Sequence, residues 1–217
     1  MEILRTLLNG LAVTLLLTFG GGALALLLAL AAGLARTQSQ RWLSLPAALY
    51  VELFRGTSAL IQLYWAVFAL PLLGVNVPAL AAGVCVLGLN AGAYGAEVVR
   101  GALAAVPVEQ WEAARVLGLS SRDTWSRVIL PQALVRALPP LNNVLIELLK
   151  NTSLASMITL SDLTFEAQSL RAATLDSAKI FGALLLIYFV LSMLCSAGFR
   201  WLERRAHERL GDVRGGA

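Results

Sequence analysis

Long uncharged stretches separated by short charged ones dominate the chain. Residues 6–35 carry no charge, and this run exceeds the about 20 apolar residues that a helix needs to span a bilayer. Residues 56–96 form a second uncharged run that is too long for one helix, and the proline- and glycine-containing stretch 71–78 divides it. Residues 180–199 are again free of charge. The pattern predicts an all-α integral membrane protein.

These runs predict five transmembrane helices in a single domain that comprises residues 1–217. The spans are expected at about 10–35, 49–70, 79–99, 137–160 and 180–200. The fourth is apolar but carries Glu147 and Lys150. The longest connection, at about 101–136, lies between the third and fourth spans, and residues 201–217 form a tail.

The composition agrees with a membrane location. Hydrophobic residues make up 58% of the chain and charged residues only 14%, against averages of about 45–50% and about 25% in globular proteins. Such a balance excludes a disordered chain, a disulfide scaffold and a freely soluble domain. The net charge of +4 comes without a dense basic run, so nothing favours nucleic-acid binding.

The arginines predict the orientation, because cytoplasmic loops of membrane proteins carry an excess of Lys and Arg. Thirteen arginines fall in segments on one predicted side: Arg36, Arg41, Arg55, Arg100, Arg115, Arg122, Arg127, Arg136, Arg200, Arg204, Arg205, Arg209 and Arg214. The opposite side has only Arg5, Arg171 and Lys179. We therefore expect the N-terminus outside and the C-terminus in the cytoplasm.

The cytoplasmic segment 101–136 is predicted to form two short amphipathic helices. Pro107 suits the start of the first helix, and Gly118 suits a left-handed turn at its end. Ser120 and Asp123 have the spacing of a capping box, and Pro131 is expected to end the second helix. Apolar residues recur along both helices: Trp111, Ala114 and Leu117 in the first, Trp125, Val128 and Ile129 in the second. Periodicity alone leaves two interpretations open: an amphipathic element that rests on lipid, or a docking site for a cytoplasmic partner protein.

The residue identities in this segment resemble a known signature. Glu112-Ala113-Ala114, then three residues, Gly118, nine residues and Val128-Ile-Leu-Pro131 resemble the "EAA" motif of ABC-importer permeases. Further stretches resemble the polar amino acid permease family, which includes histidine, glutamine and arginine importers: 54–58, 93–101, 110–114, 130–140 and 148–154. The resemblance covers about residues 10–205 and is densest at 90–156.

The resemblance implies a type I ABC importer permease fold, with five spans and a cytoplasmic coupling loop. A permease of this kind pairs with a second copy or a paralogue, docks two cytoplasmic ATPases and receives substrate from an extracytoplasmic binding protein in the bacterial inner membrane. ATP and magnesium belong to the ATPase, so the chain itself is expected to have no cofactor, metal or catalytic residue. The expected docking residues are Glu112, Ala113, Ala114, Arg115 and Gly118.

Polar residues at membrane depth predict the substrate pathway, because ionisable groups there are usually functional. Asn143, Glu147 and Asn151 share one face of the fourth span. Asn90, Tyr94 and Glu97 share one face of the third, with Glu97 near its cytoplasmic end. Gln62 is the main polar residue of the second. The candidate pathway residues are Glu147, Asn143, Asn90, Tyr94, Gln62 and Lys150.

Each of these residues also has a structural interpretation. Glu147 and Lys150 are three residues apart and could neutralise one another, and Lys150 is expected to be structural or gating. Asn90 and Asn143 could instead join helices through hydrogen bonds.

The expected function is import of polar amino acids, cationic or zwitterionic ones in particular because of Glu147, by alternating access. A permease for a compatible solute such as ectoine is the first alternative, and a channel or non-transporting scaffold is the second. A membrane-embedded enzyme is disfavoured, because the chain has one histidine, His207, and no phosphate-binding loop.

Overall fold

The computed structural model describes the backbone of residues 2–214 and the side chains of residues 6–206 and 208. These residues form helices and no strand, which confirms the all-α prediction. The α-helices are α1 (Glu2–Ala35), α2 (Arg41–Arg55), α3 (Ala59–Tyr64), α4 (Ala79–Ala104), α5 (Val108–Val116), α6 (Ser121–Asp123), α7 (Leu130–Asn151), α8 (Leu163–Thr174) and α9 (Ser177–Arg214). Shorter π and 3-10 segments lie between them: η1 (Trp65–Ala69), η2 (Leu70–Leu73), η3 (Thr124–Ile129) and η4 (Thr152–Ile158).

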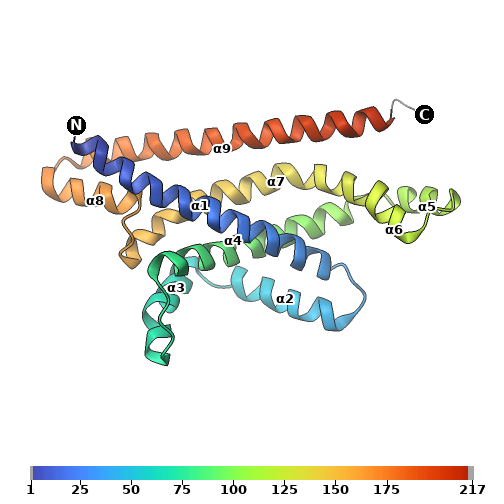
Figure 1. The fold of residues 1–217 in the computed structure, drawn as a ribbon, viewed down its shortest axis with the longest axis horizontal. Coiled ribbons are helices and arrows are strands. Elements are labelled where there is room, and N and C mark those ends of the chain that lie inside the picture. The colour runs from blue at the N-terminus through green and yellow to red at the C-terminus, as the bar shows by residue number, and fades with distance from the viewer. Residues whose placement is uncertain (1, 215–217) are drawn as a thin grey trace.

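Helices α1, α4, α7 and α9 run along the long axis of the molecule, and α4 is the central one (Figure 1). The most extensive contact is between α1 and α4. Small residues permit this approach: a Cβ at Gly95 would lie 2.7 Å from the Cβ of Ala29, and one at Gly33 would lie 2.7 Å from that of Val99. Membrane helices pack closely where such residues face each other. The backbones of α1 and α4 are thus nearly in contact.

Three of the described helical segments are long and apolar enough to cross a membrane: Thr6–Ala35, Ala79–Ala104 and Ser177–Ala206. A fourth segment is long and apolar enough only if two helical pieces joined by a bend are taken together, Arg41–Arg55 and Ala59–Leu73. Helix α7 and η4 occupy the predicted fourth span but carry Glu147, Lys150 and two internal prolines. Five spans therefore remain a prediction.

The second predicted span, at about 49–70, is not one straight helix. Helix α2 ends at Arg55, and the next helical segment departs at 100° to it. Figure 1 shows α3 running steeply away from the bundle axis. The sequence of residues 56–58, Gly-Thr-Ser, contains no proline, so the break was not expected.

The end of the bundle near the N-terminus is closed by α8, which lies between the fourth and fifth predicted spans. Asp162 caps this helix: its carboxylate accepts hydrogen bonds from the backbone N–H groups of Thr164 and Phe165 at 3.2 and 3.0 Å. Thr14 of α1 accepts a hydrogen bond from the N–H of Leu163 at 3.1 Å. The cap and this bond attach α8 to α1.

The predicted tail is helical over most of its length, because α9 continues to Arg214. The side chain of His207 and residues 215–217 lie outside the described residues.

Candidate functional site

The loop between α4 and α7 has the local structure that its sequence predicts. Helix α5 follows Pro107, and Gly118 adopts a left-handed conformation with φ of 69°. Ser120 caps the next helix, its hydroxyl accepting a hydrogen bond from the N–H of Asp123 at 3.1 Å. Glycine at the turn and serine at the cap each satisfy the backbone where a helix ends or begins.

The loop is held by its tryptophans. The rings of Trp111 and Trp125 meet edge to face with 5.4 Å between their centres. Both pack on a buried cluster from α1, α4, η3 and α7 that includes Val99, Leu103 and Ile129. The apolar face of the loop is thus covered by protein rather than turned to lipid. Leu117, expected on that face, is instead 76% exposed.

The predicted docking residues divide into two groups. Glu112, Ala113, Arg115 and Gly118 are exposed, whereas Ala114 is buried at 2% exposure. Neither Glu112 nor Arg115 forms an ion pair with any residue that the structure describes. Both charges are therefore available to a partner, while Ala114 contributes to packing.

The sequence predicted that Pro131 ends the second helix of the loop, but the helix continues through this residue. Residues 121–151 form one continuous helical segment, with the π-helical η3 directly before Pro131. In η3 the N–H of Leu130 reaches back to the carbonyl of Trp125, one residue further than in an α-helix. The wider turn accommodates a proline that lacks an N–H, and the side chain of Gln132 donates to the carbonyl of Val128 at 3.0 Å.

A narrow cleft between α4 and α7 contains four of the polar residues that share faces in the sequence. Asn90 and Tyr94 line it from α4, and Glu147 and Asn151 line it from α7. The rest of its wall is apolar: Leu87, Ala91, Val144 and Leu148. A carboxylate with two amides and a phenol can bind an ammonium or guanidinium group through charge and hydrogen bonds.

The other candidates lie elsewhere. Lys150 faces a separate depression beside Tyr188 of α9, and it forms no ion pair with Glu147 although the structure describes both side chains. Asn143 is exposed and does not line the cleft. Glu147 is therefore free at the cleft surface, and the alternative of an internal Glu147–Lys150 pair does not hold in this structure.

Gln62 and Asn90 hold the break between α2 and α3. Asn90 Nδ2 donates to the carbonyl of Phe54 at 3.0 Å and to Gln62 Oε1 at 3.3 Å. Gln62 Nε2 donates to the same carbonyl at 3.1 Å and to the hydroxyl of Thr57 at 2.7 Å. Irregular backbone inside a membrane needs such partners for its freed polar groups. Gln62 is thus structural, and Asn90 serves both the break and the cleft.

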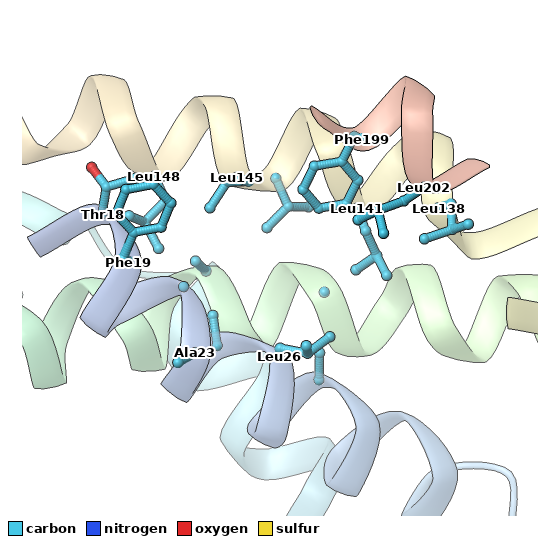
Figure 2. A pocket seen from close by; sticks show the side chains of 16 residues that line it. Thr18, Phe19, Ala23, Leu26, Leu138, Leu141, Leu145, Leu148, Phe199 and Leu202 are labelled. Carbon is cyan, nitrogen blue, oxygen red and sulfur yellow. The ribbon is translucent and has the colours of Figure 1, made fainter. Parts of the chain in front are cut away.

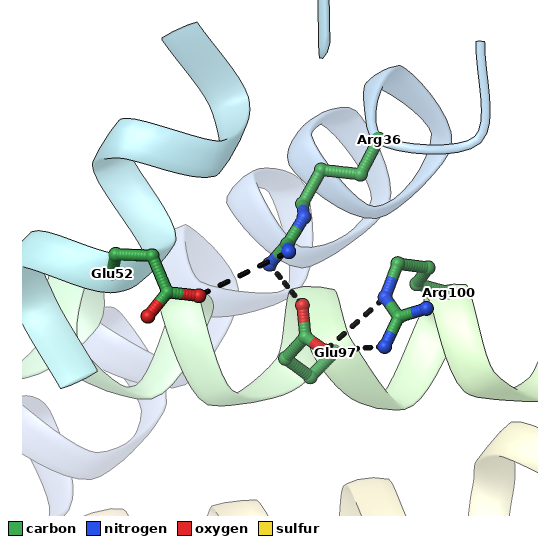
Figure 3. A network of polar contacts seen from close by, with 4 residues as sticks. All are labelled: Arg36, Glu52, Glu97 and Arg100. Atoms are coloured by element: carbon green, nitrogen blue, oxygen red, sulfur yellow. Dashed lines mark hydrogen bonds and ion pairs between the residues drawn. The ribbon is translucent and has the colours of Figure 1, made fainter. Parts of the chain in front are cut away.

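A charge cluster that the sequence did not reveal joins three helices (Figure 3). Glu97 of α4 accepts hydrogen bonds from Arg36, directly after α1, and, at 2.8 Å, from Arg100. Glu52 of α2 lies 3.9 Å from Arg36. Only the Glu97–Arg100 spacing, one helical turn, was a signal in the sequence.

Arg55 lies next to one residue of the cleft. It was counted with the cytoplasmic arginines, but its guanidinium carbon is 5.4 Å from the centre of the Tyr94 ring. The preceding residue, Phe54, is bound to Asn90. Arg55 is therefore level with the cleft residues of α4.

A cavity of about 380 Å³ lies among α1, α4, α7 and α9. Figure 2 shows leucine and phenylalanine side chains on its walls, with Thr18 as the labelled polar residue. The hydroxyl of Thr18 already donates to the carbonyl of Thr14 at 2.8 Å. Because nothing in this lining can hydrogen-bond a polar solute, the cavity is not a site for one.

Comparison with known proteins identifies the family. The family model described as "binding-protein-dependent transport system inner membrane component" matches residues 21–208. The chain belongs to this family. The resemblance expected from its loop motif is thereby confirmed.

Relatives with assigned names match most of the chain. It is 46% identical over 172 residues to the probable amino-acid ABC transporter permease protein y4tF of Sinorhizobium fredii, a match that covers 74% of this chain and 72% of that one. It is 37% identical to the glutamine transport system permease protein GlnP of Escherichia coli, over 92% of each chain. It is 36% identical to the L-cystine transport system permease protein TcyB of Bacillus subtilis, over 91% of this chain and 85% of that one.

Solved structures show the same fold. A crystal structure of an amino acid ABC transporter with histidines superposes with a TM-score of 0.87 at 35% identity, covering 94% of this chain and 95% of that chain. An inward-facing form of the MetNI methionine ABC transporter gives a TM-score of 0.79 at 21% identity, covering 95% and 98%, and supports the fold alone. The chain thus has an ABC importer permease fold.

Proposed function

We propose that this chain is the membrane subunit of an importer for polar amino acids, with a preference for cationic or zwitterionic ones. The observation that carries the proposal is the position of Glu147, which is exposed in a cleft with Asn90, Tyr94 and Asn151 and has no ion-pair partner among the described residues. An unpaired carboxylate in a largely apolar cleft favours a ligand with an ammonium or guanidinium group. Relatives named as amino-acid, glutamine and L-cystine permeases support this substrate class.

Two cytoplasmic ATPases are proposed to dock on the exposed part of the loop, at Glu112, Ala113, Arg115 and Gly118. They would bind the ATP and magnesium, and an extracytoplasmic binding protein would deliver the substrate. A second copy of the chain or a paralogue would complete the pathway. We further propose a bacterial inner-membrane location with the loop and C-terminus in the cytoplasm, in agreement with the distribution of arginines.

Reconstitution in proteoliposomes with the ATPases and the binding protein tests the proposal. Uptake of L-arginine, L-histidine and L-glutamine should require ATP, and ectoine should not be taken up. Glu147→Gln should reduce uptake of L-arginine about tenfold, because the charge-assisted hydrogen bond is lost. Asn143→Ala, an exposed residue of the same helix outside the cleft, is the matched control and should transport normally. Unchanged uptake by the Glu147 variant, or uptake of ectoine alone, would contradict the proposal.

A further inference from the structure

Arg55 lies next to Tyr94, which lines the cleft with Glu147, but Arg55 was not among the residues expected there. It is the last residue of α2, directly before the break at residues 56–58. Its guanidinium carbon lies 5.4 Å from the centre of the ring of Tyr94, which lines the cleft. The hydrogen bond from Asn90 to Phe54 fixes this end of α2 against α4. The backbone that carries Arg55 is therefore held at the height of the cleft.

Glu97 is the acidic group whose charge attracts Arg55, but its direct ion pairs are with two other arginines. Glu97 is shared by Arg36 and Arg100, and Glu52 approaches Arg36. Arg55 itself is exposed and forms no ion pair within the part of the chain that the structure describes. Its guanidinium thus has only a longer-range attraction to Glu97, and charged groups inside a membrane protein usually face a water-filled pathway or a ligand.

The contact with Tyr94 leaves the donors of Arg55 available. A guanidinium near an aromatic ring is attracted by its π electrons, and its N–H groups form a planar fork that matches a carboxylate. An amino acid carries an ammonium and a carboxylate group. The cleft has Glu147 for the first and, through Arg55 beside Tyr94, a group for the second.

We propose that Arg55 binds the carboxylate of the transported amino acid and so determines that amino acids, rather than the corresponding amines, are recognised. The inference rests on the proposed function and deepens it. A purely structural role is the alternative, since an arginine in the last turn also stabilises the end of α2 through the helix dipole. That role does not depend on whether a ligand has a carboxylate, so the ligand can distinguish the two.

The test measures binding to the purified permease with its ATPase subunits in nanodiscs, without the binding protein, whose own selectivity would mask that of the cleft. Labelled L-arginine and L-histidine are displaced by agmatine and histamine, which are the same molecules without the carboxylate. The wild type should prefer the amino acid by about 10- to 100-fold, the range of a hydrogen bond to a charged group. Arg55→Met should reduce this preference to within about threefold, and Arg55→Lys should give an intermediate value, because lysine keeps the charge but loses the fork.

Arg41→Met is the matched control, because it removes an exposed arginine at the other end of α2 and should keep the wild-type preference. Equal affinity of the wild type for L-arginine and agmatine, and for L-histidine and histamine, overturns the inference whether or not any variant folds. The inference is also overturned if both Arg55 variants keep the wild-type preference. If Arg55→Met does not assemble, a wild-type preference in Arg55→Lys is sufficient to overturn it. If the wild type binds neither L-arginine nor L-histidine, the proposed substrate class fails together with this inference. If it binds both without preferring them to the amines, only the inference about Arg55 fails.

Discussion

The side-chain amide of Asn90 donates a hydrogen bond to the carbonyl oxygen of Phe54 at 3.0 Å, and this bond connects α4 to the broken end of α2. Asn142 on α7 offers the opposite case, because its Oδ1 is buried without a hydrogen-bond partner. The two asparagines differ in how much the structure depends on their amides.

Replacement of each by the similarly shaped leucine should therefore have different effects. Asn90→Leu should lower the free energy of unfolding by about 1–3 kcal/mol, because the Phe54 carbonyl and Gln62 lose a buried donor. Asn142→Leu should be neutral or stabilising, because an unsatisfied oxygen is removed. Thermal unfolding in detergent measures both, and equal losses would contradict the assignment.

Glu97 should contribute more to stability than Glu52, although both contact Arg36. Glu97→Gln leaves Arg36, whose side chain is 18% exposed, without its main counter-ion, and should cost about 1–3 kcal/mol. Glu52 is 69% exposed and 3.9 Å away, so Glu52→Gln should cost less than about 1 kcal/mol. Chemical or thermal denaturation of the two variants at low salt makes the comparison, and a larger effect at Glu52 would refute it.

Ala113→Asp should release the ATPase without unfolding the permease. Ala113 is exposed on α5, so an added carboxylate meets only the partner. We expect a loss of co-purified ATPase of at least about tenfold, since an unpaired charge in an interface costs several kcal/mol. Ala173→Asp on α8, at the other end of the molecule, is the control and should retain the ATPase. Ala114→Asp should instead destabilise the loop itself, because Ala114 is buried.

The cap of α8 should make stability depend on pH. Burial raises the pKa of Asp162 to about 6 from its ordinary 3.8, with hydrogen bonds from Phe165 and Thr164 opposing the rise. The folded state thus binds the proton more tightly than the unfolded one, so this contribution to stability is full below about pH 4 and is lost as the pH rises through about 6.

The unfolding temperature between pH 4 and 7 tests this dependence. Asp162→Asn keeps an acceptor for the cap but cannot titrate, so it should flatten the profile, whereas Asp162→Ala should also lose about 1 kcal/mol of capping. Lys179 lowers the pKa of exposed Asp176, so Asp176→Asn should leave the profile between pH 4 and 7 unchanged. A flat profile in the wild type would show that Asp162 is not the titrating group.

Features with a local cause were predictable from the sequence. The apolar runs located α1, α4 and α9, and the conformation of Gly118 and the cap at Ser120 followed from neighbouring residues. The stripe that includes Glu147 and Asn151 followed from helical spacing. Each depends on residues within a few positions of one another.

Features with a distant cause were not predictable. The break after Arg55 depends on a bond from Asn90, 36 residues away from Phe54, so the sequence of α2 alone indicated one span. The same bend brings Arg55, which was counted with the cytoplasmic arginines, next to Tyr94 of the cleft. Lys150 was placed beside Glu147 by spacing, but its side chain lines the depression next to α8 and α9 and forms no ion pair with Glu147.

The continuity of the helical segment from Ser121 to Asn151 has a thermodynamic consequence. Its first turns belong to the loop that is proposed to bind the ATPase, and its last turns carry Glu147 and Asn151. No flexible linker separates the two ends, so a shift of one is passed to the other. Linkage then requires reciprocity: if the ATPase changes the affinity for substrate by some factor, bound substrate changes the affinity for the ATPase by that same factor.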